Sequence, residues 1–341
     1  MDKLQNNNFL TNIVTLLQTA KQQVVRSVNQ TMVITYFEIG RMIIEEQQQG
    51  KDKAEYGKAI LKELSNELTK EFGKGFSVKN LERMRSFFQI YRKSSTVLSI
   101  SEKQEALSEV FKLSWSHYLT LMRIDEEKER QFYEIEAFKN NWSIRELKRQ
   151  YDTALYTRLT LSRDKEKIKE LSVKGQVLEH AKDAIKDPYI LEFIGLPENA
   201  SYSESELEQK IIDKLEHFLL ELGTGFTFVA RQKRISFDDK HFRIDLVFYN
   251  RVLRSFVLID LKIGELKHQD IGQMQMYVNY YDREIRLEGE NKTIGIILCQ
   301  NKSESVVEYT LPENNEQIFA SKYKTVLPSK NEFKKLINEQ K

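Results

Sequence analysis

One acidic-x-Lys triplet, Asp260-Leu261-Lys262, directly follows an apolar run over residues 256–259 that is typical of a buried strand. Other triplets of this kind in the chain fit solvated helices or loops, so its position distinguishes this one. Side chains two residues apart on a strand share a face, and Asp260 and Lys262 are therefore expected to point the same way. A carboxylate and an ammonium group placed there have the chemistry to bind a metal ion and orient a water.

A second carboxylate, Asp245, interrupts the apolar run before this strand. If the two runs form a hairpin whose turn is centred on residues 250–253, Asp245 lies opposite Leu258 and shares a face with Asp260 and Lys262. Two such carboxylates suit Mg²⁺ or Mn²⁺, which would polarise a phosphoryl oxygen and activate a water. Lys262 would orient that water or stabilise charge in the transition state. A structural ion pair of Lys262 with either aspartate is the alternative.

These residues require an α/β domain to position them. After a helix come three runs rich in apolar and β-branched residues, then a second helix and a further strand. The predicted order is helix 204–222, strands 226–237, 242–249 and 255–262, helix 267–281 and strand 293–299. This order is typical of a compact α/β domain.

The N-terminal half is predicted to be helical, because all four prolines lie after residue 187. Ser77, Ser114 and Ser143 each precede an apolar periodic segment and are candidate helix N-caps. The predicted domains are a helical domain over 1–165, a charged helical linker over 166–186 and the α/β domain over 187–341. The expected fold class is a two-domain α+β protein.

Composition excludes several classes of protein. The chain has 341 residues, and its 53 basic and 51 acidic residues give a net charge of +2, which excludes a polycation that binds nucleic acid by bulk charge. Its single cysteine, Cys299, excludes a disulfide framework and a multi-cysteine zinc site. There is no phosphate-binding GxxxxGK[ST] loop. The N-terminus lacks an apolar signal core and no 18-residue apolar run occurs, so we expect a cytoplasmic protein without membrane association.

The two aspartate motifs resemble the PD-(D/E)xK nuclease superfamily, and the chain resembles more closely its YhcG-like family of bacterial nucleases. The resemblance spans most of the chain and rests on Phe242-Arg243-Ile244-Asp245, Ile259-Asp260-Leu261-Lys262, residues 218–223, Gly225-Phe226, residues 245–249, Gly272-Gln273-Met274, Tyr56-Gly57-Lys58, Gly75-Phe76-Ser77, Asn80-Leu81 and Met84-Arg85. It implies a restriction-endonuclease-like core with a central mixed sheet. It also implies that Asp245 and Asp260 bind the metal and that Lys262 is catalytic. The motif often has Glu at the position of Asp260, although both acids are accepted there, and this chain lacks the proline before Asp245, which is frequently absent.

Three further residues are candidates for the same site. Gln273 and Tyr277 share a helix face and match a Gln-x-x-x-Tyr element of several nucleases of the superfamily. The alternative is an amphipathic helix that packs on the sheet. Glu208 extends the apolar face of the first helix of the α/β domain, and the resemblance implies that it is a third metal ligand. Alternatively, Glu208 is a favourable acid in a helix first turn.

The sequence therefore predicts a Mg²⁺- or Mn²⁺-dependent nuclease that acts on nucleic acid, with DNA as the expected substrate, in genome maintenance, defence or a mobile element. Cutting both strands would favour a homodimer. The alternatives are a catalytically silent nucleic-acid-binding module and a regulatory scaffold. In the helical domain, basic residues near Phe87, Phe88 and Tyr91 suggest a DNA- or partner-binding helix, and the alternative is a core helix with a basic edge.

Overall fold

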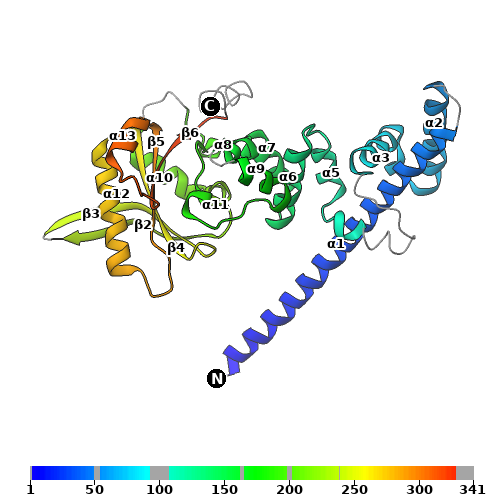
Figure 1. Cartoon of the computed structure of the whole chain (residues 1–341). Coiled ribbons are helices and arrows are strands. Elements are labelled where there is room, and N and C mark those ends of the chain that lie inside the picture. Colours follow the sequence, from blue (N-terminus) through cyan, green and yellow to red (C-terminus); the bar gives the residue numbers. More distant parts are fainter. Residues whose placement is uncertain are drawn as a thin grey trace. The chain divides into compact units, whose positions relative to one another are not determined.

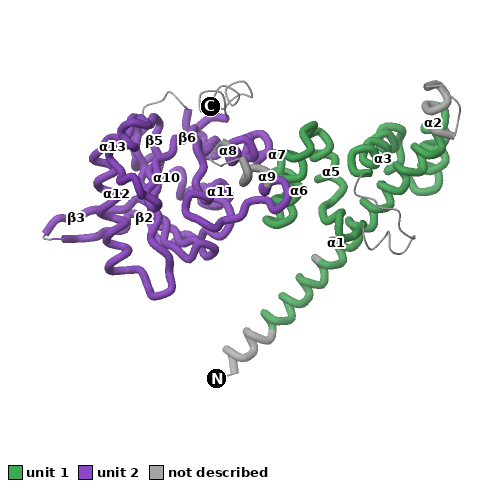
Figure 2. The backbone as a smooth tube through the Cα atoms, in the orientation of Figure 1, with its two compact units in different colours: residues 1–148 green, residues 149–341 purple. Residues whose placement is uncertain are grey.

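The computed structural model describes residues 2–49, 54–92, 107–161, 165–197, 202–237 and 239–327 (Figure 1). The chain forms two compact units, residues 1–148 and 149–341 (Figure 2). The domain boundaries expected from the sequence depend on proline and charge patterns, whereas this division follows the packing. Each unit is described separately.

Unit 1 is helical in its described residues, as expected. Its elements are α1 (Asp2–Gln49), α2 (Ala54–Phe72), η1 (Lys74–Phe76), α3 (Val78–Tyr91), α5 (Trp115–Leu121) and α6 (Glu127–Lys139), and α7 (Ile144–Asp152) begins in it. Gly40 lets α1 approach α3 closely, because a Cβ atom there would lie 2.1 Å from the carbonyl oxygen of Met84. A larger side chain at residue 40 would push the two helices apart.

The serines expected to cap helices lie at those helix starts. The Ser77 hydroxyl accepts the N–H of Asn80 at 3.4 Å, and the Ser143 hydroxyl accepts the N–H of Glu146 at 3.2 Å. Ser114 begins α5 differently, because its side chain bonds Nδ1 of His117 at 2.7 Å. The sequence thus located all three helix starts, and the capping geometry differs at one of them.

The aromatic residues of α3 belong to the core of unit 1. Phe87 and Tyr91 are buried, and the Phe87 ring centroid lies 5.1 Å from those of Phe111 and Tyr118. Phe88 packs its ring against Phe37 at 5.0 Å. These rings are engaged in packing, which favours the interpretation of α3 as a core helix with a basic edge.

The segment expected to form a charged linker has a helix in only part of its length. Residues 166–186 contain most of α9 (Lys165–Lys174) and a short 3₁₀ turn, η3 (Ala181–Ala184), and α8 (Leu155–Leu161) precedes them. Leu171 and Ser172 of α9 are buried, so this helix packs against the protein on one side.

Unit 2 is built on a mixed six-stranded sheet, which confirms the predicted fold class. Its strands are β1 (Tyr189–Ile190), β2 (Phe226–Phe237), β3 (Lys240–Asn250), β4 (Ser255–Glu265), β5 (Ile294–Asn301) and β6 (Ile318–Lys324). Their order is β1-β6-β5-β4-β3-β2, with β2, β3 and β4 antiparallel and the remaining pairs parallel. The order places β2 at one edge, beside β3, which carries Asp245, and β4, which carries Asp260, is the next strand inward.

Helices cover both faces of this sheet. The first predicted helix is two helices, α10 (Glu204–Asp213) and α11 (Leu215–Leu222), which pack on the face that presents Phe248 and Ile259. Helix α12 (His268–Tyr280), the π-helical η5 (Tyr281–Ile285) and α13 (Glu304–Thr310) follow later in the chain, and α12 packs on the face that presents Val247 and Leu258. The strands are therefore buried on both sides except where β2 and β3 extend beyond the helices. No helix in the described parts of the chain is both long and apolar enough to cross a membrane.

Candidate functional site

The β3–β4 hairpin has the predicted order but not the predicted pairing. Leu258 lies opposite Val247, and Asn250 lies opposite Ser255, so the expected pairing of Leu258 with Asp245 is wrong by two residues. A two-residue shift keeps every side chain on the same face. Continued along the strands, this register brings Asp245 opposite Asp260.

The pairing of β3 with β4 stops just before the two aspartates. Its last pair is Leu246 with Ile259, and beyond it the Asp245 carboxylate accepts the backbone N–H of Leu261 at 2.8 Å. Ile244 packs with the cluster under α12, whereas Leu246 packs with the opposite cluster. The alternation of side chains is therefore interrupted at Asp245, whose carboxylate lies between the diverging strands.

Asp260 is buried and pairs with Lys262. The side chain of Asp260 is 3% exposed, and its Oδ2 atom lies 2.9 Å from Nζ of Lys262. Burial and the nearby Asp245 carboxylate raise the pKa of Asp260 to about 7, and Lys262 only partly opposes them. Burial would lower the pKa of Lys262, but the Asp260 carboxylate outweighs burial and raises it. The pair therefore retains an ammonium group beside two carboxyl groups that repel one another.

Gln232 connects Asp245 to Glu208, and its role was not predicted. Its side-chain amide donates to Oε2 of Glu208 at 2.5 Å and to Oδ1 of Asp245 at 3.0 Å. Its φ of 47° is left-handed, a conformation that costs a non-glycine residue of order 1 kcal/mol. Glu208 is buried, and its Oε1 atom lies 3.0 Å from Nε of Arg231. The structure thus links Glu208 to Asp245 through an amide.

A second unpredicted neighbour, Glu204, lies at the start of α10. Its carboxylate is 3.9 Å from Nζ of Lys262 and accepts the N–H of Ile263 at 3.4 Å. As the first residue of α10, it has the position of an ordinary first-turn acid, so its type and spacing gave no sign of this contact.

Gln273 and Tyr277 interact as their spacing predicts, on the other side of β3. The Gln273 amide donates to the Tyr277 hydroxyl, which donates to the backbone carbonyl of Arg243 at 2.8 Å. Burial raises the pKa of Tyr277 to about 12, and the charges of Asp260 and Asp245 contribute. Tyr277 is therefore both a core residue and an electrostatic neighbour of the aspartates.

The donor set fits a divalent cation held by few protein ligands. Among the residues that the structure describes, no group of three or more Asp, Glu, His or Cys side chains is placed to hold a metal ion. Asp260 is buried and Asp245 is half-buried, and burial together with the nearby charge of Asp245 raises the pKa of Asp260. Mg²⁺ is commonly bound by one or two carboxylates, with water and substrate phosphate completing its shell. The fit therefore depends on Asp245 and Asp260, with Glu208 as a neighbour.

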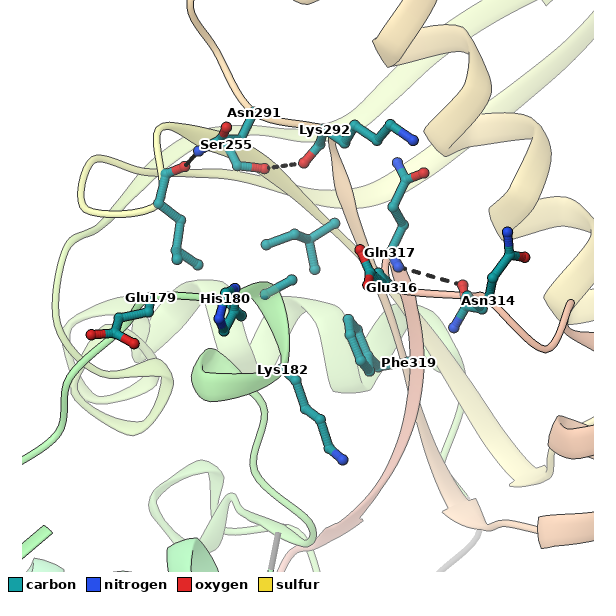
Figure 3. A pocket seen from close by; sticks show the side chains of 14 residues that line it. Glu179, His180, Lys182, Ser255, Asn291, Lys292, Asn314, Glu316, Gln317 and Phe319 are labelled. Atoms are coloured by element: carbon teal, nitrogen blue, oxygen red, sulfur yellow. Dashed lines mark hydrogen bonds between the residues drawn. The ribbon is translucent and has the colours of Figure 1, made fainter. Parts of the chain in front are cut away.

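A separate pocket of about 550 Å³ lies where β4 and β5 begin (Figure 3). Ser255 at the start of β4 and Ile294 at the start of β5 line it, with His180 and Phe319. Asp260 lies five residues further along β4. This pocket is therefore distinct from the aspartate site.

Comparison with known proteins gives consistent results for both halves of the chain. The family described as "YhcG PDDEXK nuclease domain" matches residues 182–338, and the family described as "DUF1016 N-terminal domain" matches residues 12–158. The chain is 38% identical over 336 residues to a protein of Escherichia coli (strain K12) named "Putative nuclease YhcG", covering 93% of this chain and 89% of that protein.

Two solved structures also align with the chain. A repair endonuclease from Pyrococcus abyssi aligns with 20% identity and a TM-score of 0.27, and a structure of EndoMS in apo form aligns with 16% identity and a TM-score of 0.25. Each alignment covers 38% of this chain and about half of the solved chain, so neither bears on the activity of this protein. The extended match to the Escherichia coli protein is decisive, and this chain belongs to the YhcG-like family, with a PDDEXK nuclease domain as its C-terminal half.

Proposed function

We propose that unit 2 hydrolyses phosphodiester bonds in DNA with the help of a divalent metal ion, Mg²⁺ or Mn²⁺. The observation that carries this proposal is the arrangement of Asp245, Asp260 and Lys262, in which a half-buried carboxyl group, a buried one and an ammonium group meet where two strands diverge. Family membership supports the nuclease class, and the donor set supports the metal.

Each side chain has a distinct part in this proposal. Asp245 and Asp260 hold the ion, which when bound supplies a Lewis acid for the phosphoryl oxygen and lowers the pKa of water. Lys262 remains protonated and donates hydrogen bonds to the attacking water or to the phosphoryl oxygens as negative charge develops on them. Gln232 keeps the Asp245 carboxylate oriented, and Glu208 accepts from the same amide and is a candidate third ligand through water.

Gln273 and Tyr277 are proposed to act beside this group. Their hydrogen-bonded chain ends on the carbonyl of Arg243, two residues before Asp245, so it fixes the backbone that carries the aspartate. A Gln273 amide reoriented toward solvent would also be in place to contact a DNA strand.

A DNA substrate would place the protein in the bacterial cytoplasm, in genome maintenance, defence or a mobile element. If the protein cleaves both strands of a DNA duplex, each DNA strand needs its own active site. A homodimer would supply the two sites. Unit 1 is then proposed to bind DNA or a protein partner through the basic edge of α3.

A cleavage assay tests this function directly. Purified protein is incubated with linear duplex, branched and single-stranded DNA, with Mg²⁺, Mn²⁺ or EDTA. The proposal expects cleavage of at least one substrate, lost in EDTA and in the Asp260→Asn variant. Nucleic-acid binding without metal-dependent cleavage of any substrate would instead indicate a catalytically silent binding module.

A further inference from the structure

The β2–β3 hairpin extends beyond the helices that cover the sheet (Figure 1). One of its faces is apolar where it meets α12, since Ile235 is buried in that cluster and Phe242 packs against it. The residues that alternate with these on the other face are polar and exposed. The hairpin therefore presents a solvated face that no described helix covers.

Two arginines lie directly opposite one another on this face. Arg234 and Arg243 are cross-strand partners, and both are exposed. Neither guanidinium group has a hydrogen-bond or ion-pair partner among the described residues. Like charges directly opposite in an antiparallel pair destabilise the hairpin. Such a pair gains from an anion that neutralises both groups, and an arginine guanidinium group is suited to bind phosphate oxygens.

The arginine pair is aligned with the candidate active site. Two successive cross-strand pairs on this face are Ser236 with His241 and Arg234 with Arg243, and two residues further along these strands the side chains of Gln232 and Asp245 are hydrogen-bonded at 3.0 Å. Two residues along a strand span about 7 Å. A DNA strand carries one phosphate per about 3.4 Å of helix axis, so a phosphate near the arginines would lie within a few nucleotides of one at Asp245.

We propose that Arg234 and Arg243 bind the phosphate backbone of the nucleic-acid substrate beside the bond that is cleaved. This inference rests on the proposed nuclease function and adds to it the surface that positions the strand. Lys233 and Lys240, exposed on the same hairpin, add positive charge, whereas the turn carries Asp239. The arginine pair therefore lies between Asp239 and the acids of the site and forms the cationic part of the path.

The test compares salt-dependent DNA binding by the full-length wild type and two double variants. Arg234→Gln/Arg243→Gln removes the proposed contacts, and Arg251→Gln/Arg254→Gln removes two exposed arginines of the turn between β3 and β4. Fluorescence anisotropy with a duplex DNA in EDTA gives the Kd over a range of salt concentrations, and cleavage with Mg²⁺ or Mn²⁺ is measured in parallel. A single-stranded DNA of the same sequence distinguishes the two forms of backbone.

Loss of two phosphate contacts should reduce the slope of log K against log salt by about 1.8 for duplex DNA, or about 1.4 for the single strand. The control variant should retain the wild-type slope. The melting temperature of the Arg234→Gln/Arg243→Gln variant should equal or exceed that of the wild type, because the repulsion is removed. Replacement of both arginines by lysine should restore most of the slope.

The outcomes separate this inference from the proposed function. If the wild type cleaves DNA but Arg234→Gln/Arg243→Gln matches it in slope, Kd and cleavage, the arginine contact is wrong and the nuclease remains. A lower melting temperature would also overturn the inference, because it would show that the arginines have a structural role. If the wild type neither binds nor cleaves DNA, the proposed function itself fails.

Discussion

The Asp245 carboxylate accepts the backbone N–H of Leu261 at 2.8 Å, across the point where β3 and β4 separate. A backbone amide that loses its strand partner must find another acceptor if it is buried. Here that acceptor is the side chain of Asp245, whose charge lies close enough to Asp260 to help burial raise the pKa of that acid. The divergence of the strands thus leaves a backbone amide that holds Asp245 close to Asp260.

Replacement of Lys262 by alanine is expected to lower the rate of cleavage on the order of 10²–10³-fold, with little change in DNA affinity. The ammonium group acts on charge that develops only in the transition state. Its loss should not strand a charge, because Asp260, with a pKa already raised to about 7, can take up a proton. Single-turnover cleavage, DNA binding and a thermal melt measure the three effects.

Lys302→Ala is the matched control, since Lys302 pairs with Asp187 at 2.7 Å away from the site. This control should lose stability and retain cleavage. If Lys262→Ala instead loses about 3–5 kcal/mol of stability and cleaves DNA normally, the Lys262–Asp260 contact is a structural ion pair.

Replacement of Asp260 by asparagine should stabilise the metal-free protein at pH 8. The native pKa near 7 lies above the unfolded value of about 3.9, so the native state binds more protons between these pH values. Wild-type stability therefore falls as pH rises from about 4 to 7 and is level above that. The asparagine variant should lack this fall and gain up to about 4 kcal/mol at pH 8.

Denaturant unfolding in EDTA at several pH values measures this effect. Added Mn²⁺ should raise the melting temperature of the wild type at pH 8 and leave that of Asp260→Asn unchanged. A variant less stable than the wild type at pH 8 would contradict the proposed repulsion between the two acids.

Replacement of Gln232 by glycine should weaken metal binding about 10–100-fold, the usual effect of removing a group that orients a ligand. Glycine keeps the left-handed backbone at a φ of 47° and removes only the amide that holds Asp245 and Glu208. Calorimetric titration with Mn²⁺ gives the affinity. Gln269→Ala, an exposed glutamine of α12, is the control. Equal Mn²⁺ affinities in the wild type and both variants would show that Gln232 does not orient the metal ligands.

The apolar patterns of the sequence predicted most of the elements of unit 2. Both predicted bounds of the strand at 226–237 agree with β2. The predicted bounds of the strand at 255–262 and of the helix at 267–281 differ from those of β4 and α12 by about three residues or fewer. The strands β1 and β6 were missed. β1 has only two residues, and β6 carries Ser321, Lys322 and Lys324 in place of a continuous apolar run.

The details of the site were less accessible to the sequence. The register of Asp245 was wrong by two residues because it depends on the geometry of the turn, which an apolar pattern does not specify. The contacts of Gln232 depend on one left-handed residue in a long strand, and glutamine has no special preference for that conformation. Residue types and face parity were enough to propose Asp245, Asp260 and Lys262, whereas the groups that orient them required the structure.

Replacement of Glu221 by glutamine should destabilise unit 2 by about 3–5 kcal/mol, because it leaves buried cations without their anion. Glu221 and Arg158 are fully buried and 2.6 Å apart, and Arg149 lies 3.3 Å from the second carboxylate oxygen. Burial alone would raise the pKa of Glu221, but Arg158, Lys186 and Arg149 lower it to about 2. Wild-type stability should therefore fall as pH drops from about 4 to 2, and the variant should lack this dependence.

Denaturant unfolding between pH 2 and 7 measures both effects. Glu192→Gln is the control, because Glu192 is partly exposed. Glu192 contacts Arg149 at 2.7 Å, and in this variant Arg149 would keep Glu221 as its ion-pair partner. The control should lose about 1 kcal/mol or less. The same network predicts that a fragment starting at residue 149 folds, whereas one starting at residue 182, which lacks both arginines, does not. A stable fragment 182–341, or a Glu221→Gln variant as stable as the wild type, would show that this buried network is dispensable for the nuclease domain.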